Sequence, residues 1–230
     1  MKKVCVVVLL VLSIISLFAE IDERKPLMDY YKDQNLNNFL KAVSYYGVKS
    51  ELSKDLADEA NLMSVVYAQL HKSLNKMVEN ADSLAPGQAF QTANILLEMG
   101  QYQQAIKIYN KINDKTPNWS CPWRHKGEAY LKVQDYINSE KALLKAIETR
   151  KEHYDAYLML AEVYLKQDKF KDAYNTMQDA FKYKGKDIEE EEEVYSRKDI
   201  DLMYLEILKG AKMKKEATEW EKQIKQKYKM

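Results

Sequence analysis

One short stretch, CPWRHKGE, carries three side chains capable of metal binding or acid–base chemistry. Cys121, His125 and Glu128 are four and three residues apart, so a helix would place them on one face. Together with Glu162 from a following helix, they could hold a metal ion such as Zn²⁺. His125 could equally be a polar surface residue, and Cys121 a small apolar core residue. We expect the second arrangement and predict no metal site.

Catalytic motifs are missing from the rest of the sequence. Its three histidines, His71, His125 and His153, have neither the spacing of a nucleophilic triad nor that of a metalloenzyme motif. No glycine-rich phosphate-binding loop occurs either. The sequence therefore predicts a protein that is not an enzyme and needs no cofactor.

Composition favours helices as the elements that position these residues. Six glycines and four prolines in 230 residues provide fewer turn signals than a sheet-rich fold needs. Hydrophobic residues make up 46% and charged residues 31% of the chain, which suffices for a packed core and argues against intrinsic disorder. We expect an all-α protein.

The first 19 residues have the pattern of a secretory signal peptide. Lys2 and Lys3 precede an apolar run from Val4 to Phe18, and Ala19 is a small residue at a possible cleavage point. Cleavage there predicts an exported protein, periplasmic or secreted; an uncleaved membrane anchor is the alternative. Without this segment the formal charge changes from +1 to −1, so we expect no nucleic-acid partner.

An internal repeat of 34 residues organises the middle of the chain. Aligning 87–120, 121–154 and 155–188 produces three columns, of which eight of nine positions hold small residues. The columns are Ala93, Gly127 and Ala161; Ala105, Ser139 and Ala173; and Ile112, Ala146 and Ala180. Small residues at these intervals suit two helices per unit whose backbones cross closely, with larger side chains filling the space between the crossings.

This pattern resembles the tetratricopeptide repeat, a helix–turn–helix unit with a W-x2-L-G-x2-Y…A-x3-F…P signature. The middle unit carries the signature best, in Trp123, Gly127, Tyr130, Ser139, Leu143 and Ala146. Lys126 departs from it, because it replaces the usual leucine. The resemblance implies an α-solenoid of stacked antiparallel helix pairs, which form a superhelix with a concave groove.

The alignment also predicts the boundaries of the chain's parts. After the signal peptide (1–19), we expect degenerate helical hairpins (20–84), three repeat units (85–185) and an acidic insertion (186–198). A degenerate repeat with a lysine-rich capping helix (199–230) follows. The alternative for this last helix is peripheral contact with a membrane surface.

The resemblance implies that function lies in the groove formed by the first helix of each unit. The groove residues expected by alignment are Phe90, Asn94, Leu97, Arg124, His125, Glu128, Lys132, Leu158, Glu162 and Lys166. One subgroup of the family holds chaperone C-terminal carboxylates at positions that correspond here to Phe90, Asn94, His125, Asp155 and Met159. Only Asn94 fits, so we do not predict that activity.

We therefore expect an adaptor of the cell envelope that binds another protein or a peptide through the groove. A second hypothesis is a small-ligand-binding component of a transport system, with a closed pocket between the N-terminal helices and the repeats.

Overall fold

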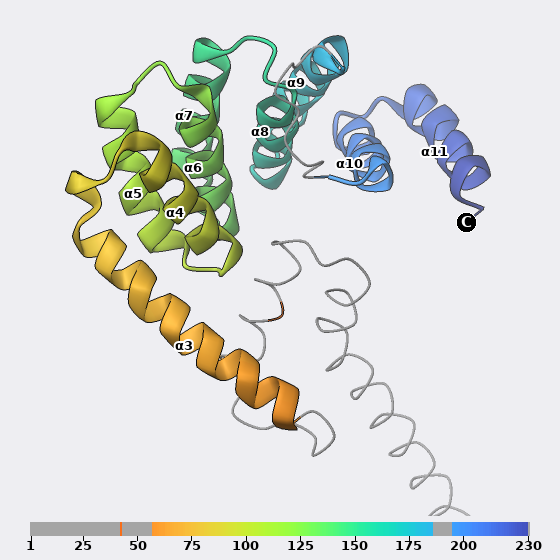
Figure 1. The fold of residues 1–230 in the computed structure, drawn as a ribbon. Coiled ribbons are helices and arrows are strands. Elements are labelled where there is room, and N and C mark those ends of the chain that lie inside the picture. Colours follow the sequence, from red (N-terminus) through yellow and green to blue (C-terminus); the bar gives the residue numbers. More distant parts are fainter. Residues whose placement is uncertain (1–41, 43–56, 186–194, 230) are drawn as a thin grey trace, which may run out of the picture. The chain divides into compact units, whose positions relative to one another are not determined.

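The computed structural model of the protein describes Ala42 and residues 57–185 and 195–229. These residues form nine α-helices and one short 3-10 helix, and they contain no strand (Figure 1). The helices are α3 (Ala57–Glu79), α4 (Pro86–Glu98), α5 (Tyr102–Lys115), α6 (Ser120–Lys132), α7 (Tyr136–Thr149), α8 (Tyr154–Lys166), α9 (Phe170–Tyr183), α10 (Arg197–Gly210) and α11 (Lys214–Tyr228), with η2 (Ala81–Ser83) between the first two. The all-α prediction is confirmed.

The chain divides into two compact units. One comprises Met1–Ala81 and Ile95–Gln101, and the other comprises Asp82–Asn94 and Tyr102–Met230. In the first, α3 is a single continuous helix of 23 residues. The predicted signal peptide and most of the predicted N-terminal hairpins lie outside the described residues. None of the described helices is both long and apolar enough to cross a membrane.

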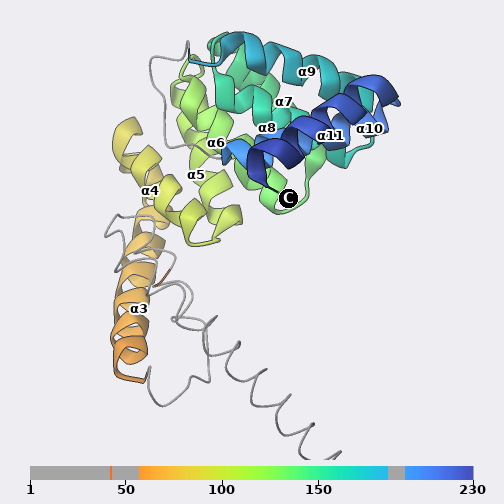
Figure 2. The same cartoon turned by 90° about the vertical axis from the view of Figure 1, so that its right-hand side faces the viewer.

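The second unit consists of antiparallel helix pairs in chain order. Helix α6 packs on α7, α8 on α9 and α10 on α11, and each pair also contacts the next. The first helices of these pairs, α6, α8 and α10, contact one another in sequence. Figure 2 looks along this stack, with α10 and α11 in front. This is the solenoid of antiparallel helix pairs that the repeat predicts.

The same turn ends every first helix. Gly100, Gln134, Asp168 and Lys212 all have left-handed backbone angles, with φ between 57° and 73°. After each of them, the next residue donates its N–H to a carbonyl five residues earlier, as Asp135 does to Tyr130 and Lys169 to Tyr164. This is the Schellman arrangement that satisfies the last carbonyls of a helix. Only the first of the four turns uses glycine, the residue that adopts this conformation without steric cost.

The small-residue columns lie where the repeat places them. All nine positions are buried. A Cβ atom on Gly127 would lie 2.5 Å from Cγ of Leu143 in the paired helix α7, so α6 and α7 cross with no room for a methyl group. The hydroxyl of Ser139 donates to the carbonyl of Gly127 at 2.7 Å across the same crossing. Glycine therefore leaves room for Leu143 here, and serine supplies a hydrogen bond across the crossing.

Consecutive pairs are also joined by a buried polar contact. The hydroxyl of Ser120, at the start of α6, donates to the carbonyl of Ala146 in α7 at 2.8 Å and lies 2.6 Å from Nδ1 of His153. His153 directly precedes α8. One serine thus connects three helices, and His153 serves packing rather than surface chemistry.

The C-terminal pair combines a small core with a polar outer surface. Ala217 and Ile224 of α11 are buried against a cluster that includes Met203 of α10 and Leu158 of α8. The lysines of this region are exposed: Lys209, Lys212, Lys214, Lys215, Lys222, Lys225, Lys227 and Lys229. A capping helix requires such a surface. Helix α10 begins at Arg197, two residues before the predicted start of this region.

Candidate functional site

A pocket of about 390 Å³ lies between the ends of α6 and α8. It is lined by Glu128, Leu131 and Lys132 of α6, by Gln134 and Tyr136 at the following turn, by Met159, Glu162 and Lys166 of α8, and by Tyr195. Four of the groove residues expected from the sequence are therefore brought together: Glu128, Lys132, Glu162 and Lys166.

The repeat explains why these four side chains meet. Glu128 and Lys132 are four residues apart on α6, and Glu162 and Lys166 have the same spacing on α8, so each pair occupies one helical face. The two pairs are separated by 34 residues, the length of one repeat. Because α6 and α8 are adjacent, the pairs lie at equivalent positions on neighbouring helices.

Glu128 forms its salt bridge with Arg124 rather than with Lys132. Nη1 of Arg124 lies 2.8 Å from Oε2 of Glu128, and only 2% of the arginine side chain is exposed. Nη2 of Arg124 lies 2.8 Å from Nε2 of His125. Because a guanidinium can only donate, this histidine nitrogen accepts. Arg124 therefore fixes the orientation of both neighbouring side chains.

Tyr195 completes the pocket and holds the second carboxylate. Its hydroxyl donates to Oε2 of Glu162 at 2.5 Å. Burial, followed by the charge of Glu162, raises the pKa of Tyr195 well above its ordinary value, so the hydroxyl remains a donor at neutral pH. Tyr195 directly precedes Ser196, the residue that caps α10 by accepting from the N–H of Asp199. The cap thus fixes the start of α10 beside the tyrosine.

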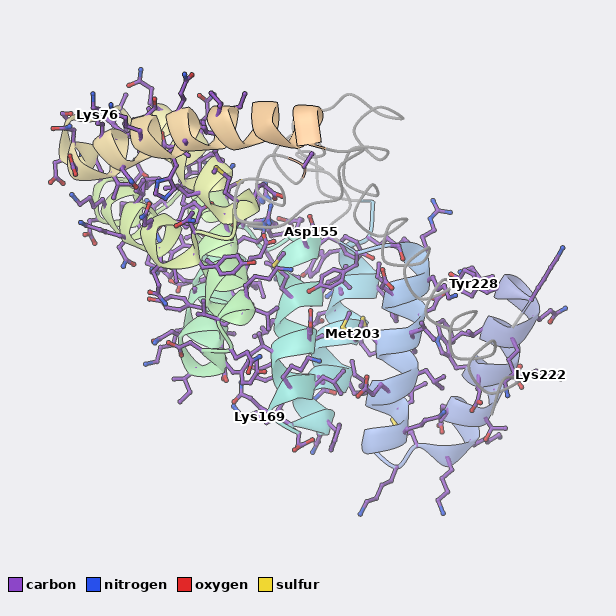
Figure 3. All side chains as sticks on the ribbon, turned by 90° about the horizontal axis from the view of Figure 1, so that it is seen from below. Lys76, Asp155, Lys169, Met203, Lys222 and Tyr228 are labelled. Carbon is purple, nitrogen blue, oxygen red and sulfur yellow. The ribbon has the colours of Figure 1, made fainter. Side chains whose placement is uncertain are left out.

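Figure 3 shows Asp155 and Lys169 at opposite ends of α8. Asp155 belongs to the first turn of α8, and its charge also helps to raise the pKa of Tyr195. Lys169 follows the other end of the helix and forms an ion pair with Glu140 at 2.8 Å. It does not line the pocket.

Two expected groove residues of α4 belong to an aromatic cluster. The ring of Phe90 lies 4.7 Å from Trp119 and 5.1 Å from His125, measured between centroids. Asn94 accepts a hydrogen bond from the hydroxyl of Tyr109 at 2.7 Å. Both side chains are partly exposed, so this cluster adjoins the surface.

Three other expected groove residues are buried. Leu97, Arg124 and Leu158 are 5%, 2% and 1% exposed, and Leu158 packs within the core formed with α9 and α10. An apolar anchor for a partner at Leu158 would require exposed surface that this side chain does not have. Alignment identified the helical face but could not tell which of its positions the next helix covers.

Sequence reasoning missed several pocket residues. Leu131 belongs to α6, Gln134 to the turn after it and Tyr136 to the start of α7, and Tyr195 was assigned to the acidic insertion. For Tyr195 the available signal was an aromatic residue directly before a serine cap, a position that often packs on the first turns of the helix that follows.

The metal-binding alternative receives no geometric support. Cys121 is buried, and Glu128 is engaged by Arg124. Across residues 57–185 and 195–229, no three histidine, cysteine, aspartate or glutamate side chains gather as a metal ion would require.

Residues 90–114 match the family model described as tetratricopeptide repeat. This segment of the chain is similar to a tetratricopeptide repeat. The matched segment covers most of α4 and most of α5. It falls in the first repeat unit, whereas the signature residues are most complete in the second. The search of curated proteins found no match.

Several solved structures share the fold of this chain at low sequence identity. A crystal structure of MamA is 15% identical, with a TM-score of 0.58 over 79% of this chain and 97% of that one. MamA 41-end from Desulfovibrio magneticus RS-1 is 18% identical, with a TM-score of 0.52 over 74% and 84%. YrrB, described as a TPR protein with an unusual peptide-binding site, is 18% identical, with a TM-score of 0.53 over 66% and 72%.

Proposed function

We propose that this chain is a non-enzymatic adaptor of the cell envelope that binds a peptide or a partner protein along the face formed by α6 and α8. The observation that carries the proposal is the pocket shared by these first helices. Its walls combine apolar surface from Leu131 and Met159 with charged groups from Lys132, Glu162 and Lys166. A few placed polar groups beside apolar surface are typical of a recognition site.

Two further observations support this function. The peptide-binding site in the description of YrrB belongs to a protein of the same fold. The two carboxylates of the pocket are also held in place, Glu128 by a salt bridge and Glu162 by a hydrogen bond, as a site that recognises a partner needs. The envelope location rests on the signal-like pattern of residues 1–19.

The transport-system hypothesis remains the alternative. It requires a closed pocket between the N-terminal helices and the repeats, and residues 1–41 and 43–56 of that region lie outside the described residues. The pocket between α6 and α8 differs from such a cavity, because Lys132 and Lys166 on its wall are exposed.

Site-specific photo-crosslinking in the native envelope tests the proposal. A photoreactive phenylalanine analogue replaces Lys132 or Lys166 on the pocket side, and matched probes replace Lys141 or Lys171 on the second helices, where these lysines are exposed. We expect one discrete crosslinked partner from the first pair and none from the second. Crosslinks from Lys141 or Lys171 alone would show that the partner binds elsewhere.

A further inference from the structure

Both carboxylates of the pocket are already engaged by donors other than the nearest lysine. A glutamate followed four residues later by a lysine has the spacing of an ion pair along a helix. Here Arg124 forms a salt bridge with Glu128 at 2.8 Å, and the Tyr195 hydroxyl donates a hydrogen bond to Glu162 at 2.5 Å. The two Glu–Lys pairs that the sequence offers, on α6 and on α8, are therefore not formed.

The pocket therefore has two lysine side chains that can bind an anion. Lys132 and Lys166 are exposed, and neither has an ion-pair partner among the described residues. They occupy equivalent positions on adjacent helices, whose axes pack about 8–10 Å apart. Each flexible lysine side chain can therefore reach an anion placed between the helices.

We propose that the pocket recognises an acidic side chain, aspartate or glutamate, of a bound peptide and holds it between Lys132 and Lys166. The apolar surface of Leu131 and Met159 contacts a neighbouring apolar residue of the same peptide. A basic side chain fits less well, because it would approach two ammonium groups and find both carboxylates already hydrogen-bonded. This inference rests on the proposed function and names the chemistry of its partner.

Tyr195 acts as a positioning residue for this site. By donating a hydrogen bond to Glu162, it keeps that carboxylate from forming a direct ion pair with Lys166 on the same helix face. Replacing the tyrosine with phenylalanine keeps the ring but frees Glu162 to pair with Lys166. Tyr195→Phe should therefore weaken recognition of an acidic residue while the pocket remains intact.

Selection of random heptapeptides displayed on phage, with the purified full chain as bait, tests the proposal. We expect aspartate and glutamate to be enriched about fivefold at one position, the factor that one solvent-exposed ion pair supplies. The enrichment should disappear with the double variant Lys132→Gln plus Lys166→Gln. With Lys132→Glu plus Lys166→Glu, the selected peptides should carry lysine or arginine at that position instead. Tyr195→Phe should reduce it.

The matched control is Lys141→Gln plus Lys171→Gln, which removes the same charge from the second helices and should leave the enrichment unchanged. All four lysines are exposed, and circular dichroism checks that the variants fold. Peptides selected without an acidic preference, a preference that survives in the Lys132 and Lys166 glutamine variant, or no selected peptide would overturn the inference. The first two results leave the adaptor function standing; only missing crosslinks at Lys132 and Lys166 remove that function.

Discussion

Helices α6 and α8 occupy equivalent places in successive repeats, yet they bury different kinds of side chain. The buried residues of α8 are all apolar or aromatic, and include Leu158 and Leu160. At the equivalent positions α6 buries Arg124 and Lys126. One backbone arrangement therefore accepts either kind of side chain, provided that a buried charge finds partners.

The partners of these charges come from different elements. Arg124 uses Glu128 and His125 of its own helix, whereas Lys126 donates to Asn110 of α5 at 3.2 Å and lies 3.9 Å above the Trp123 ring. In α8 the corresponding leucines need only packing. Helix α8 therefore contributes mainly to stability. The buried charges of α6 cost some stability, and they orient polar groups beside the pocket.

The largest expected effect on stability comes from replacing the buried arginine of α6 with the leucine that α8 has at the equivalent position. Arg124→Leu copies Leu158 but leaves the carboxylate of Glu128 without its main partner. We expect a loss of about 2–3 kcal/mol in unfolding free energy, measured by urea denaturation. Adding Glu128→Gln removes the unpaired charge and should recover part of the loss. Unchanged stability of the single variant would mean that the two helices are interchangeable here.

The helix crossing provides the next test. Gly127→Ala copies Ala161, but the new methyl group would meet Leu143, which lies 2.5 Å from the Cβ position. The equivalent partner in the next repeat is Met177, a more flexible side chain. We expect Gly127→Ala to cost about 1–2 kcal/mol, and the added change Leu143→Met to restore most of it. A fully stable single variant would contradict the tight crossing.

Lys126 offers a smaller effect that depends on pH. Desolvation lowers the pKa of Lys126 from 10.5 to about 8, so the folded protein releases this proton before the unfolded chain does. Burying the charged lysine lowers the free energy of unfolding by its full amount below pH 8. This loss of stability diminishes as pH rises from 8 towards 10.5.

Lys126→Leu, which copies Leu160, should therefore stabilise the protein by about 1 kcal/mol at pH 7. The gain should shrink at pH 9.5 in urea denaturation, because the wild-type chain becomes more stable over that range. Lys141→Leu, at an exposed position of α7, is the matched control for replacing a lysine with leucine. A gain at Lys126 that stays constant with pH would assign the effect to packing alone.

The repeat could be predicted because packing imposes it on the sequence. Ala93, Gly127 and Ala161 keep the same spacing since each must allow two backbones to approach, and this requirement is visible without coordinates. The bonds of Arg124 and Tyr195 leave no such periodic trace. They depend on which of several possible donors the fold places beside each carboxylate. Tyr195, the donor to Glu162, lies 33 residues away from it in the sequence.

The turns after α6 and α8 give the smallest expected effect. Gln134 and Asp168 both have left-handed backbone angles, with φ of 61° and 57°. Glycine adopts this conformation freely, and aspartate tolerates it better than glutamine does. We expect Gln134→Gly to stabilise by about 0.5–1 kcal/mol and Asp168→Gly by less, measured by urea denaturation.

A matched control separates this effect from the general cost of glycine. Lys141→Gly, on the exposed surface of α7, should destabilise by up to about 1 kcal/mol because it has no strained backbone to relieve. The sign at Gln134 must therefore be opposite to the sign at Lys141. If all three glycine variants lost stability equally, the backbone strain after α6 would be too small to matter, and the two turns would differ only in sequence.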